Sequence, residues 1–296
     1  MTGTDIVSRL TMESRRTILG MGGAEPASAT GNPSVDRLPG WVSLLRAPNP
    51  GPMTLDGTNT WILRAPGAAF GTVIDPGPLD EEHLLRIAER GPFQFILITH
   101  GHHDHVEGAE RLSELLGGTA ILAADPAHCL HGEPLDPNES LGGNGLEIHV
   151  LDTPGHTRDS VCFLVECEGE RVMFTGDTIL GRGTTVVAAP DGDLSSYLAS
   201  LEVLRAYENV LMLPGHGPAR HDTAALAGEY LSHRMERLAQ VRAAMAAGAR
   251  TPEAVVDVVY PDIDPRVRFA AEWSAAAQID HLERESAAGA DGLDRL

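Results

Sequence analysis

Short apolar runs that end in polar or glycine-rich turns recur along the first two thirds of the chain. Their length and their Gly or Pro punctuation predict buried β-strands. Several of these runs are followed at once by a residue that can bind a metal or a proton. The predicted strands cover residues 41–45, 60–63, 72–74, 95–99, 120–123, 148–151, 171–174 and 210–213.

Apolar residues at helical spacing lie between and after these strands. In residues 80–90 the leucine, isoleucine and alanine positions form one side of a helix. A second helix is predicted at 106–116, with Asp104 as its N-cap. Strands and helices thus alternate up to about residue 220, and only helices follow. Further helices are predicted at residues 194–207, 222–249, 251–260 and 264–286.

Composition limits the class of protein. The 296 residues suffice for one large and one small domain, and 42% hydrophobic residues suit a globular fold. No apolar run reaches the roughly 18 residues of a membrane span, so we expect no membrane partner. Cys129, Cys162 and Cys167 lack metal-motif or disulfide spacing, which predicts reduced thiols in a cytoplasmic protein. Cys162 and Cys167 flank a strand-like stretch and should be buried.

The formal net charge is −20, and all 22 basic residues are arginines. An acidic surface favours small or weakly charged substrates and disfavours a nucleic-acid backbone, which needs basic stripes. The first 35 residues, rich in Gly, Ser, Thr and Ala, predict a flexible arm. Residues 14–19 resemble a twin-arginine export signal, but residues 20–26 lack the apolar segment that export requires.

A cluster of histidines follows the predicted strand that ends at residue 99. Residues 99–105 read Thr-His-Gly-His-His-Asp-His. Crowded imidazoles repel one another when protonated, whereas neutral imidazoles bind divalent metals well. A polar turn or a chance histidine-rich tract is the alternative interpretation. The spacing offers two pairs of ligand-type side chains, as two neighbouring ions would require: His100, His102, Asp104 and His105.

Three more ligand-type residues follow predicted strands further along the chain. His156, Asp177 and His216 each come after an apolar run and a Gly- or Pro-containing turn. Taken singly, the two histidines would be loop residues and the aspartate a helix N-cap. Taken with the histidine cluster, four strand–loop units that end in metal-type residues predict one shared metal centre.

The pattern HxHxDH, followed by His, Asp and His, resembles that of the metallo-β-lactamase superfamily of metallohydrolases over residues 40–220. The resemblance implies an α/β fold, an αββα sandwich with the metals at one edge. His103 occupies a spacer position and is expected to face solvent or to support a ligand. The resemblance assigns the first metal to His100, His102 and His156, the second to Asp104, His105 and His216, and the bridging position to Asp177.

Residues 49–60, 181–185 and 230–234 resemble one branch of the superfamily. That branch includes the mitochondrial β-lactamase-like endoribonuclease, polyketide acyl-carrier thioesterases and many bacterial hydrolases. Its members end in a small winged-helix-like domain. For this domain, RNA binding, closure of the site and homodimerisation all remain open. The implied division is an arm at 1–35, a catalytic domain at 36–221 and a mostly helical, winged-helix-like domain at 222–296.

The chain departs from the family pattern at two turns. Val106-Glu107-Gly108 stands where Gly-Gly often follows the motif, and Asp159 stands where a glycine is usual. Ser160 is expected to bond a loop backbone, and His128 and His131 are expected at the surface. The remaining polar candidates for substrate contact, for which turn and capping bonds are equally expected, are Asn59, Thr60, Arg182, Thr184 and Thr185.

The implied chemistry is hydrolysis. Two divalent ions lower the pKa of a bridging water to about neutral, and the hydroxide attacks a carbonyl or phosphorus. Asp104 would be the catalytic residue that orients this nucleophile or relays its proton. Zn²⁺ suits the imidazole-rich ligand set, with iron or manganese as alternatives.

The predicted function is hydrolysis of an ester, thioester or lactone of a small or carrier-bound substrate. A single-strand endoribonuclease is the alternative, and a non-catalytic metal-binding protein is the second alternative. Residues 222–296 hold 13 acidic residues against 8 arginines, which makes a poor groove for RNA. Turnover of β-lactams is not expected, because true metallo-β-lactamases are typically exported and many differ in the second metal site.

Overall fold

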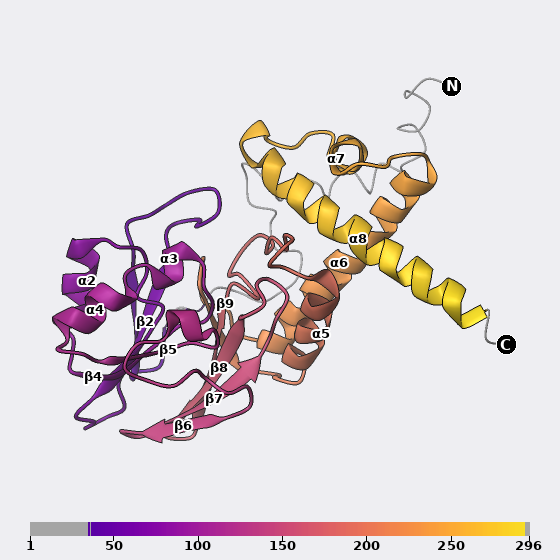
Figure 1. The fold of residues 1–296 in the computed structure, drawn as a ribbon. Coiled ribbons are helices and arrows are strands. Elements are labelled where there is room, and N and C mark those ends of the chain that lie inside the picture. Colours follow the sequence, from indigo (N-terminus) through magenta and orange to yellow (C-terminus); the bar gives the residue numbers. More distant parts are fainter. Residues whose placement is uncertain (1–34, 36, 294–296) are drawn as a thin grey trace.

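The computed structural model describes residue 35 and residues 37–293 of the chain. The arm predicted for residues 1–35 therefore lies outside the described residues, except for Val35. The described chain forms two β-sheets flanked by helices, and a helical region follows them (Figure 1).

The first sheet has five strands in the order β1-β2-β3-β4-β5. The pairs β1–β2 and β2–β3 are antiparallel, whereas β3–β4 and β4–β5 are parallel. Parallel pairing puts the carboxyl ends of β3 and β4 at the same edge of the sheet. The strands are β1 (Val42–Arg46), β2 (Asn59–Leu63), β3 (Gly71–Ile74), β4 (Phe93–Leu97) and β5 (Ala120–Leu122).

The second sheet has the order β10-β9-β8-β7-β6, and only β9–β10 is parallel. The edge strand β6 was not predicted, because its sequence Ser-Leu-Gly-Gly has no apolar pattern. A two-residue turn, Asn144-Gly145, with positive φ at both residues joins β6 to β7, and this dipeptide was the available signal. The strands are β6 (Ser140–Gly143), β7 (Leu146–Asp152), β8 (Val161–Cys167), β9 (Glu170–Gly176) and β10 (Leu211–Pro214).

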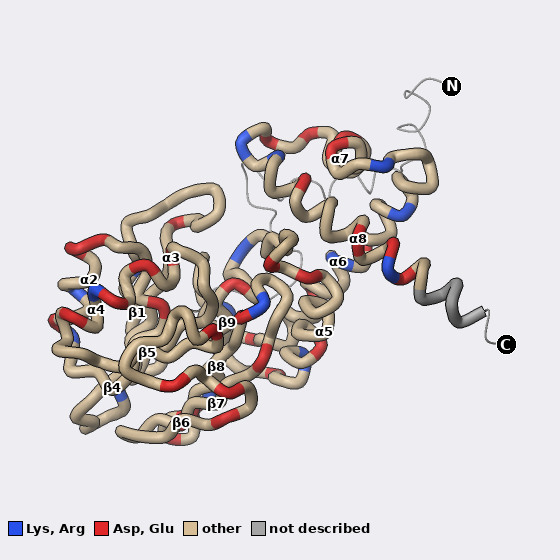
Figure 2. Tube along the Cα trace, in the orientation of Figure 1, with Lys and Arg blue, Asp and Glu red and all other residues tan. Residues whose placement is uncertain are grey.

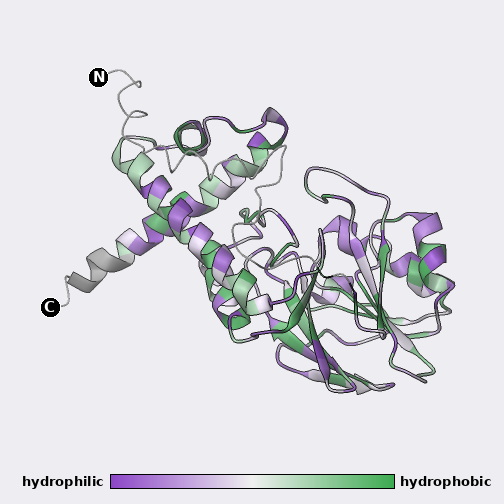
Figure 3. Ribbon diagram, turned by 180° about the vertical axis from the view of Figure 1, so that it is seen from behind, coloured by the Kyte–Doolittle hydropathy of each residue, from purple (hydrophilic) through white to green (hydrophobic). Residues whose placement is uncertain are grey.

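Alternating side chains build the layers of the sandwich. Trp61 and Leu63 of β2 lie between the sheets in one core with Phe163 and Phe174, whereas Ile62 packs on the opposite face against helices. The outer face of the second sheet packs on a helix in the same way. The strands are therefore mostly hydrophobic (Figure 3), and the predicted αββα arrangement is confirmed. The flanking helices are α2 (Glu81–Ala88) and α4 (Ala109–Leu115) on the first sheet and α5 (Leu194–Leu204) on the second.

The helix predicted at 106–116 is in fact two short helices. The short helix α3 (His103–Val106) begins inside the histidine cluster, and Gly108 separates it from α4. The predicted N-cap at Asp104 is wrong, because His102 occupies the N-cap position with an extended backbone and no capping side-chain bond. Asp104 lies in the first turn of α3, and its carboxylate does not cap this helix.

After the second sheet, residues 223–293 contain only helical elements, as predicted. Asp222 and Thr251 accept backbone N–H groups and so cap the first turns of α6 and α7. The apolar side chains of α6 belong to one core with those of α5, α7 and α8, and α8 crosses α6 in Figure 1. Within the described range, no helix has both the length and the apolar character to cross a bilayer. The elements are α6 (Thr223–Ala246), α7 (Pro252–Val259), the 3₁₀ turn η3 (Pro265–Val267) and α8 (Arg268–Leu293).

The three cysteines are free, and Cys162 and Cys167 are buried as predicted. Both belong to β8 and pack in the cores on its two sides. They serve there as small apolar side chains.

Candidate metal centre

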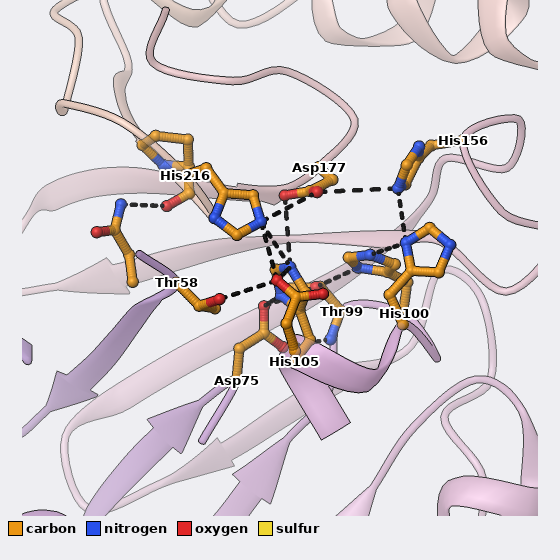
Figure 4. Close-up of polar contacts among 12 residues, drawn as sticks. Thr58, Asp75, Thr99, His100, His105, His156, Asp177 and His216 are labelled. Carbon is orange, nitrogen blue, oxygen red and sulfur yellow. Dashed lines mark hydrogen bonds and ion pairs between the residues drawn. The ribbon is translucent and has the colours of Figure 1, made fainter. Parts of the chain in front are cut away.

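Seven side chains gather at one edge of the two sheets (Figure 4). The chain after β4 carries four of them, the β7–β8 loop carries one, and the last two follow the parallel strands β9 and β10. Parallel neighbours end at the same edge, which explains how residues far apart in sequence come together. We call these side chains the histidine–aspartate centre: His100, His102, Asp104, His105, His156, Asp177 and His216.

One half of the centre consists of three histidines. Nδ1 of His102 lies 3.0 Å from Nε2 of His100 and 3.0 Å from Nε2 of His156. Burial lowers the pKa of all three rings, to about 4 for His156. Three neutral imidazoles therefore face one another, in the protonation state that a metal ligand needs.

The other half combines Asp104, His105 and His216. Nε2 of His216 lies 3.1 Å from Oδ2 of Asp104 and 3.2 Å from Nε2 of His105. Nε2 of His105 lies 3.4 Å from the same aspartate oxygen. These three side chains enclose a second position at which three ligand-type atoms converge.

Asp177 lies between the two halves. Its Oδ2 is 3.3 Å from Nε2 of His216 and 3.9 Å from Nε2 of His156, and its Oδ1 is 3.5 Å from Nε2 of His105. Oδ1 is buried and has no hydrogen-bond partner among the described residues. A carboxylate in this place can contact ions in both halves.

The arrangement fits divalent metal ions. Nitrogen ligands about 2.0–2.1 Å from a tetrahedral Zn²⁺ lie about 3.3 Å from one another, close to the spacing in both halves. The buried oxygen of Asp177 that lacks a donor would also gain a partner from a cation. Within the centre, three overlapping groups of side chains could each hold an ion, and together they include all seven residues.

Charge differs between the halves. Burial lowers the pKa of His105, but Asp104, Asp177 and Asp75 outweigh this effect and raise it well above the ordinary value. Burial also lowers the pKa of His216, but Asp177 and Asp104 raise it to about 9. Burial raises the pKa of each aspartate of the centre, and the neighbouring histidines more than reverse this. Because protons occupy this half in the absence of a metal, a cation that binds there must displace them.

Asp75 holds two of the rings in place. It is almost fully buried at the end of β3 and accepts hydrogen bonds from Nδ1 of His105 (2.8 Å) and from the Thr99 hydroxyl (2.7 Å). Since the Thr99 hydroxyl donates to Asp75, it accepts from Nδ1 of His100 at 3.0 Å. Nε2 of both rings thus faces the centre. The predicted strand ended at residue 74, and Asp75 was not among the residues predicted for the centre.

Two further groups orient ligand-type side chains, and neither was predicted from the sequence. The Thr58 hydroxyl donates to Oδ2 of Asp104 at 2.9 Å, while Nδ2 of Asn49 donates to that hydroxyl at 3.0 Å. Nδ1 of His156 donates to the carbonyl of Val186 at 2.7 Å. No local pattern marks a backbone carbonyl as a partner, so only the fold reveals this last contact.

The weaker polar candidates mostly make internal bonds. Asn59 donates to two carbonyls of the loop that carries His216, and Thr60 contacts a buried histidine of α2. Arg182 forms an exposed ion pair with Asp56. Ser160 accepts from a loop N–H, as predicted. These contacts support turns and packing.

The other histidines near the motif lie outside the centre. His103 and His131 are exposed, as predicted, and His128 is half-buried beside Gly101.

Comparison with known proteins agrees with this geometry. The family model of the metallo-beta-lactamase superfamily matches residues 53–216, and that of the beta-lactamase associated winged helix domain matches residues 251–292. The chain therefore belongs to the metallo-β-lactamase superfamily, a class of metal-dependent hydrolases, and carries the winged helix domain associated with it. The resemblance drawn from the sequence is confirmed.

Individual relatives cover most of the chain. A beta-lactamase-like protein 2 homolog of Caenorhabditis elegans is 30% identical over 254 residues, which are 80% of this chain and 82% of that protein. An atrochrysone carboxyl ACP thioesterase of Aspergillus fumigatus is 32% identical over 267 residues, 80% and 79% of the two chains. The structure of a beta-lactamase domain protein from Burkholderia ambifaria has the same fold, with a TM-score of 0.69 and 22% sequence identity. The match covers 85% of this chain and 91% of that protein.

Proposed function

We propose that this protein is a dinuclear metal-dependent hydrolase that cleaves a thioester, or a related ester or lactone, of a small or carrier-bound acyl substrate. The observation that carries the proposal is the pair of ligand groups joined by Asp177. The proposed ligands are His100, His102 and His156 for one ion, Asp104, His105 and His216 for the other, and Asp177 for both.

Two ions held there would supply an activated water near neutral pH and polarise the substrate carbonyl. Asp104 is the proposed proton acceptor for that water. Its side chain is 27% exposed, more open than that of Asp177 at 12%, and its low pKa keeps it ionised. The Thr58 hydroxyl holds one of its oxygens, which leaves the other oxygen free to take a proton.

A thioester is the favoured bond because several relatives are named for this activity, among them the ACP thioesterase of Aspergillus fumigatus and the thioesterase of Emericella nidulans. The net charge of −20 also suits a substrate other than a polyanion. Basic positions on α6 and α8 are interspersed with acidic ones in Figure 2, and α7 carries only acidic ones, so the described helices lack the continuous basic row that an RNA backbone would need.

Zn²⁺ is the proposed metal, since five of the seven side chains are imidazoles. Iron and manganese are the alternatives that metal analysis would distinguish. The division into a catalytic domain at 36–221 and a C-terminal domain at 222–296 is also proposed, and the N-cap of α6 at Asp222 supports this boundary. Homodimerisation and a cytoplasmic location stay predictions.

The test compares two substrate classes on metal-loaded protein. One arm uses acyl-CoA, acyl-pantetheine and lactone substrates, and the other uses labelled single-stranded RNA. We expect thioester turnover that falls by roughly 10²–10⁴-fold in Asp104→Ala, because proton transfer typically contributes that much. Asp136→Ala, at an exposed position outside the centre, is the matched control and should retain full activity.

Two results would overturn the proposal. RNA cleavage that is lost in Asp104→Ala, without any ester or thioester turnover, would assign the endoribonuclease function instead. A metal content well below one ion per chain, in protein purified and dialysed with Zn²⁺, would refute the dinuclear centre.

A further inference from the structure

The loop at residues 178–187 touches two members of the histidine–aspartate centre through its backbone and one hydroxyl. Thr185 donates its hydroxyl to the backbone carbonyl of Asp177 at 2.8 Å. The backbone carbonyl of the next residue, Val186, accepts a hydrogen bond from Nδ1 of His156 at 2.7 Å. The position of this loop therefore sets the orientation of His156 and the backbone from which Asp177 projects.

Helix α6 of the C-terminal region holds this loop. The Tyr230 hydroxyl accepts from the N–H of Leu180 at 3.1 Å and donates to the carbonyl of Gly183 at 3.0 Å. One turn further on, the guanidinium of Arg234 donates to the carbonyl of Thr185. Two side chains on one face of α6 thus hold the loop through the backbone of its residues 180, 183 and 185.

Arg234 is a buried arginine whose hydrogen-bonding groups are only partly satisfied. It is only 4% exposed, and its Nε has no hydrogen-bond partner among the described residues. Its guanidinium lies 5.1 Å from the ring centre of Tyr197, whose hydroxyl donates to the Thr178 carbonyl of the same loop. Burying a guanidinium opposes folding, and the ring and the carbonyl only partly offset that cost.

We propose that Arg234 is a positioning residue for the histidine–aspartate centre, and that the C-terminal region acts through it to set His156 and Asp177. The route is short: Arg234 donates to the Thr185 carbonyl, and of the two residues at that peptide bond, Thr185 bonds the backbone carbonyl of Asp177 and Val186 accepts from the ring of His156. The inference rests on the proposed function of the centre as a metal site. Under this proposal the C-terminal region supports the histidine–aspartate centre, a role for which neither RNA nor a second copy of the chain is needed.

Arg237 provides a matched control on the same helix. It is 6% exposed, lies 4.5 Å from the ring centre of Tyr260 and donates to Gln240 at 2.7 Å. Both partners belong to the C-terminal region. Arg237→Met therefore removes an equally buried guanidinium without touching the loop.

The experiment measures metal binding, not turnover. The dissociation constant for Zn²⁺ is measured by competition with a chromophoric chelator, and the Co²⁺-loaded protein gives a ligand-field spectrum. We expect Arg234→Met to raise the dissociation constant by roughly 10–100-fold and to alter the spectrum, because loss of a group that orients a ligand has that effect. Arg234→Lys keeps one donor and should recover part of the loss. Arg237→Met should leave both metal readouts as in the wild type.

A second variant covers the case in which Arg234→Met fails to fold. Thr185→Val keeps the volume of the side chain and removes the hydroxyl that bonds the backbone carbonyls of Asp177 and Thr178. It should weaken metal binding in the same direction.

The proposal is overturned if Arg234→Met, or Thr185→Val in its place, matches Arg237→Met in dissociation constant and spectrum. A wild type that binds two ions but hydrolyses no thioester, ester or lactone would overturn the proposed function and leave the positioning role intact.

Discussion

Individual hydrogen bonds on the outer side of the centre decide which ring nitrogen faces inward. His105 and His156 each donate Nδ1 to an oxygen, one of Asp75 and the other of Val186. A neutral imidazole that donates from one nitrogen presents a lone pair at the other. These bonds therefore fix the orientation of both rings before any ion is bound, so less ordering would be required on binding, although His105, whose pKa is raised, would also have to lose a proton.

The centre is also closely packed, with no room for a side chain at Gly215. A Cβ added at Gly215 would lie 2.5 Å from Oδ1 of Asp177 and 2.6 Å from Cε1 of His105. Gly215→Ala should therefore displace one of these side chains and reduce bound Zn²⁺ and activity together, by about tenfold or more. Metal analysis after dialysis against Zn²⁺ is the measurement.

Gly228→Ala is the control for this substitution. Gly228 lies in α6, and a Cβ there would meet nothing within 4 Å. Alanine in a helix is favoured by up to about 1 kcal/mol over glycine, so this variant should bind metal normally and melt no lower than the wild type. Full metal content in Gly215→Ala would contradict the steric argument.

At the scale of single elements, α6 has contacts on several sides. It packs on α5 beside the second sheet, on α7 and α8 in the C-terminal region, and on the loop at 178–187. Its own sequence shows a helix but not these partners, because its apolar and buried polar positions face several neighbours at once.

His233 makes the stability of this element depend on pH. Burial, with Arg234 and Arg237 nearby, lowers its pKa from 6.5 to about 4. Between these two values the unfolded chain binds more protons than the folded chain, so the free energy of unfolding falls as the pH drops through this range. His233→Gln removes the effect, and its thermal midpoint should fall less than that of the wild type between about pH 7.5 and about pH 5.

Thermal unfolding with chelator in every sample keeps the metal contribution out of this comparison. His131→Asn is the control, since His131 is exposed and asparagine tolerates its positive φ. An equal fall of the midpoint in His233→Gln and in the wild type would refute the role of His233.

At the scale of the whole molecule, the centre joins the two sheets. The histidine cluster follows β4 of the first sheet, whereas Asp177 and His216 follow β9 and β10 of the second. Ions bound to both sets would connect the halves of the sandwich, in addition to the apolar core between them.

Metal removal should therefore destabilise the protein. A ligand at 100 times its dissociation constant stabilises the folded state by about 2.7 kcal/mol. For a domain of this size, that corresponds to a thermal midpoint lower by roughly 5–10 °C after chelation. Zn²⁺ should restore the midpoint and Mg²⁺, which prefers oxygen ligands, should not. An unchanged midpoint after removal of ions that metal analysis had detected would contradict this expectation.

The elements of the fold were predictable where their signals are local. The apolar runs at β2, β4 and β9 and the helical spacing of α6 lie within single segments. The failures have equally local causes: β6 has no apolar alternation, and α3 begins inside a run of metal-type residues that hides a helix start.

The sequence by itself determined the fold class, the family and the set of residues on which the metal proposal depends, because periodicity and motif spacing are short-range properties. Only the tertiary structure decided which groups orient those residues. Asp75 lies 30 positions from His105, and the carbonyl of Thr185 lies 49 positions from Arg234. Contacts at such separations depend on strand order and on helix packing, which no local pattern of side chains records.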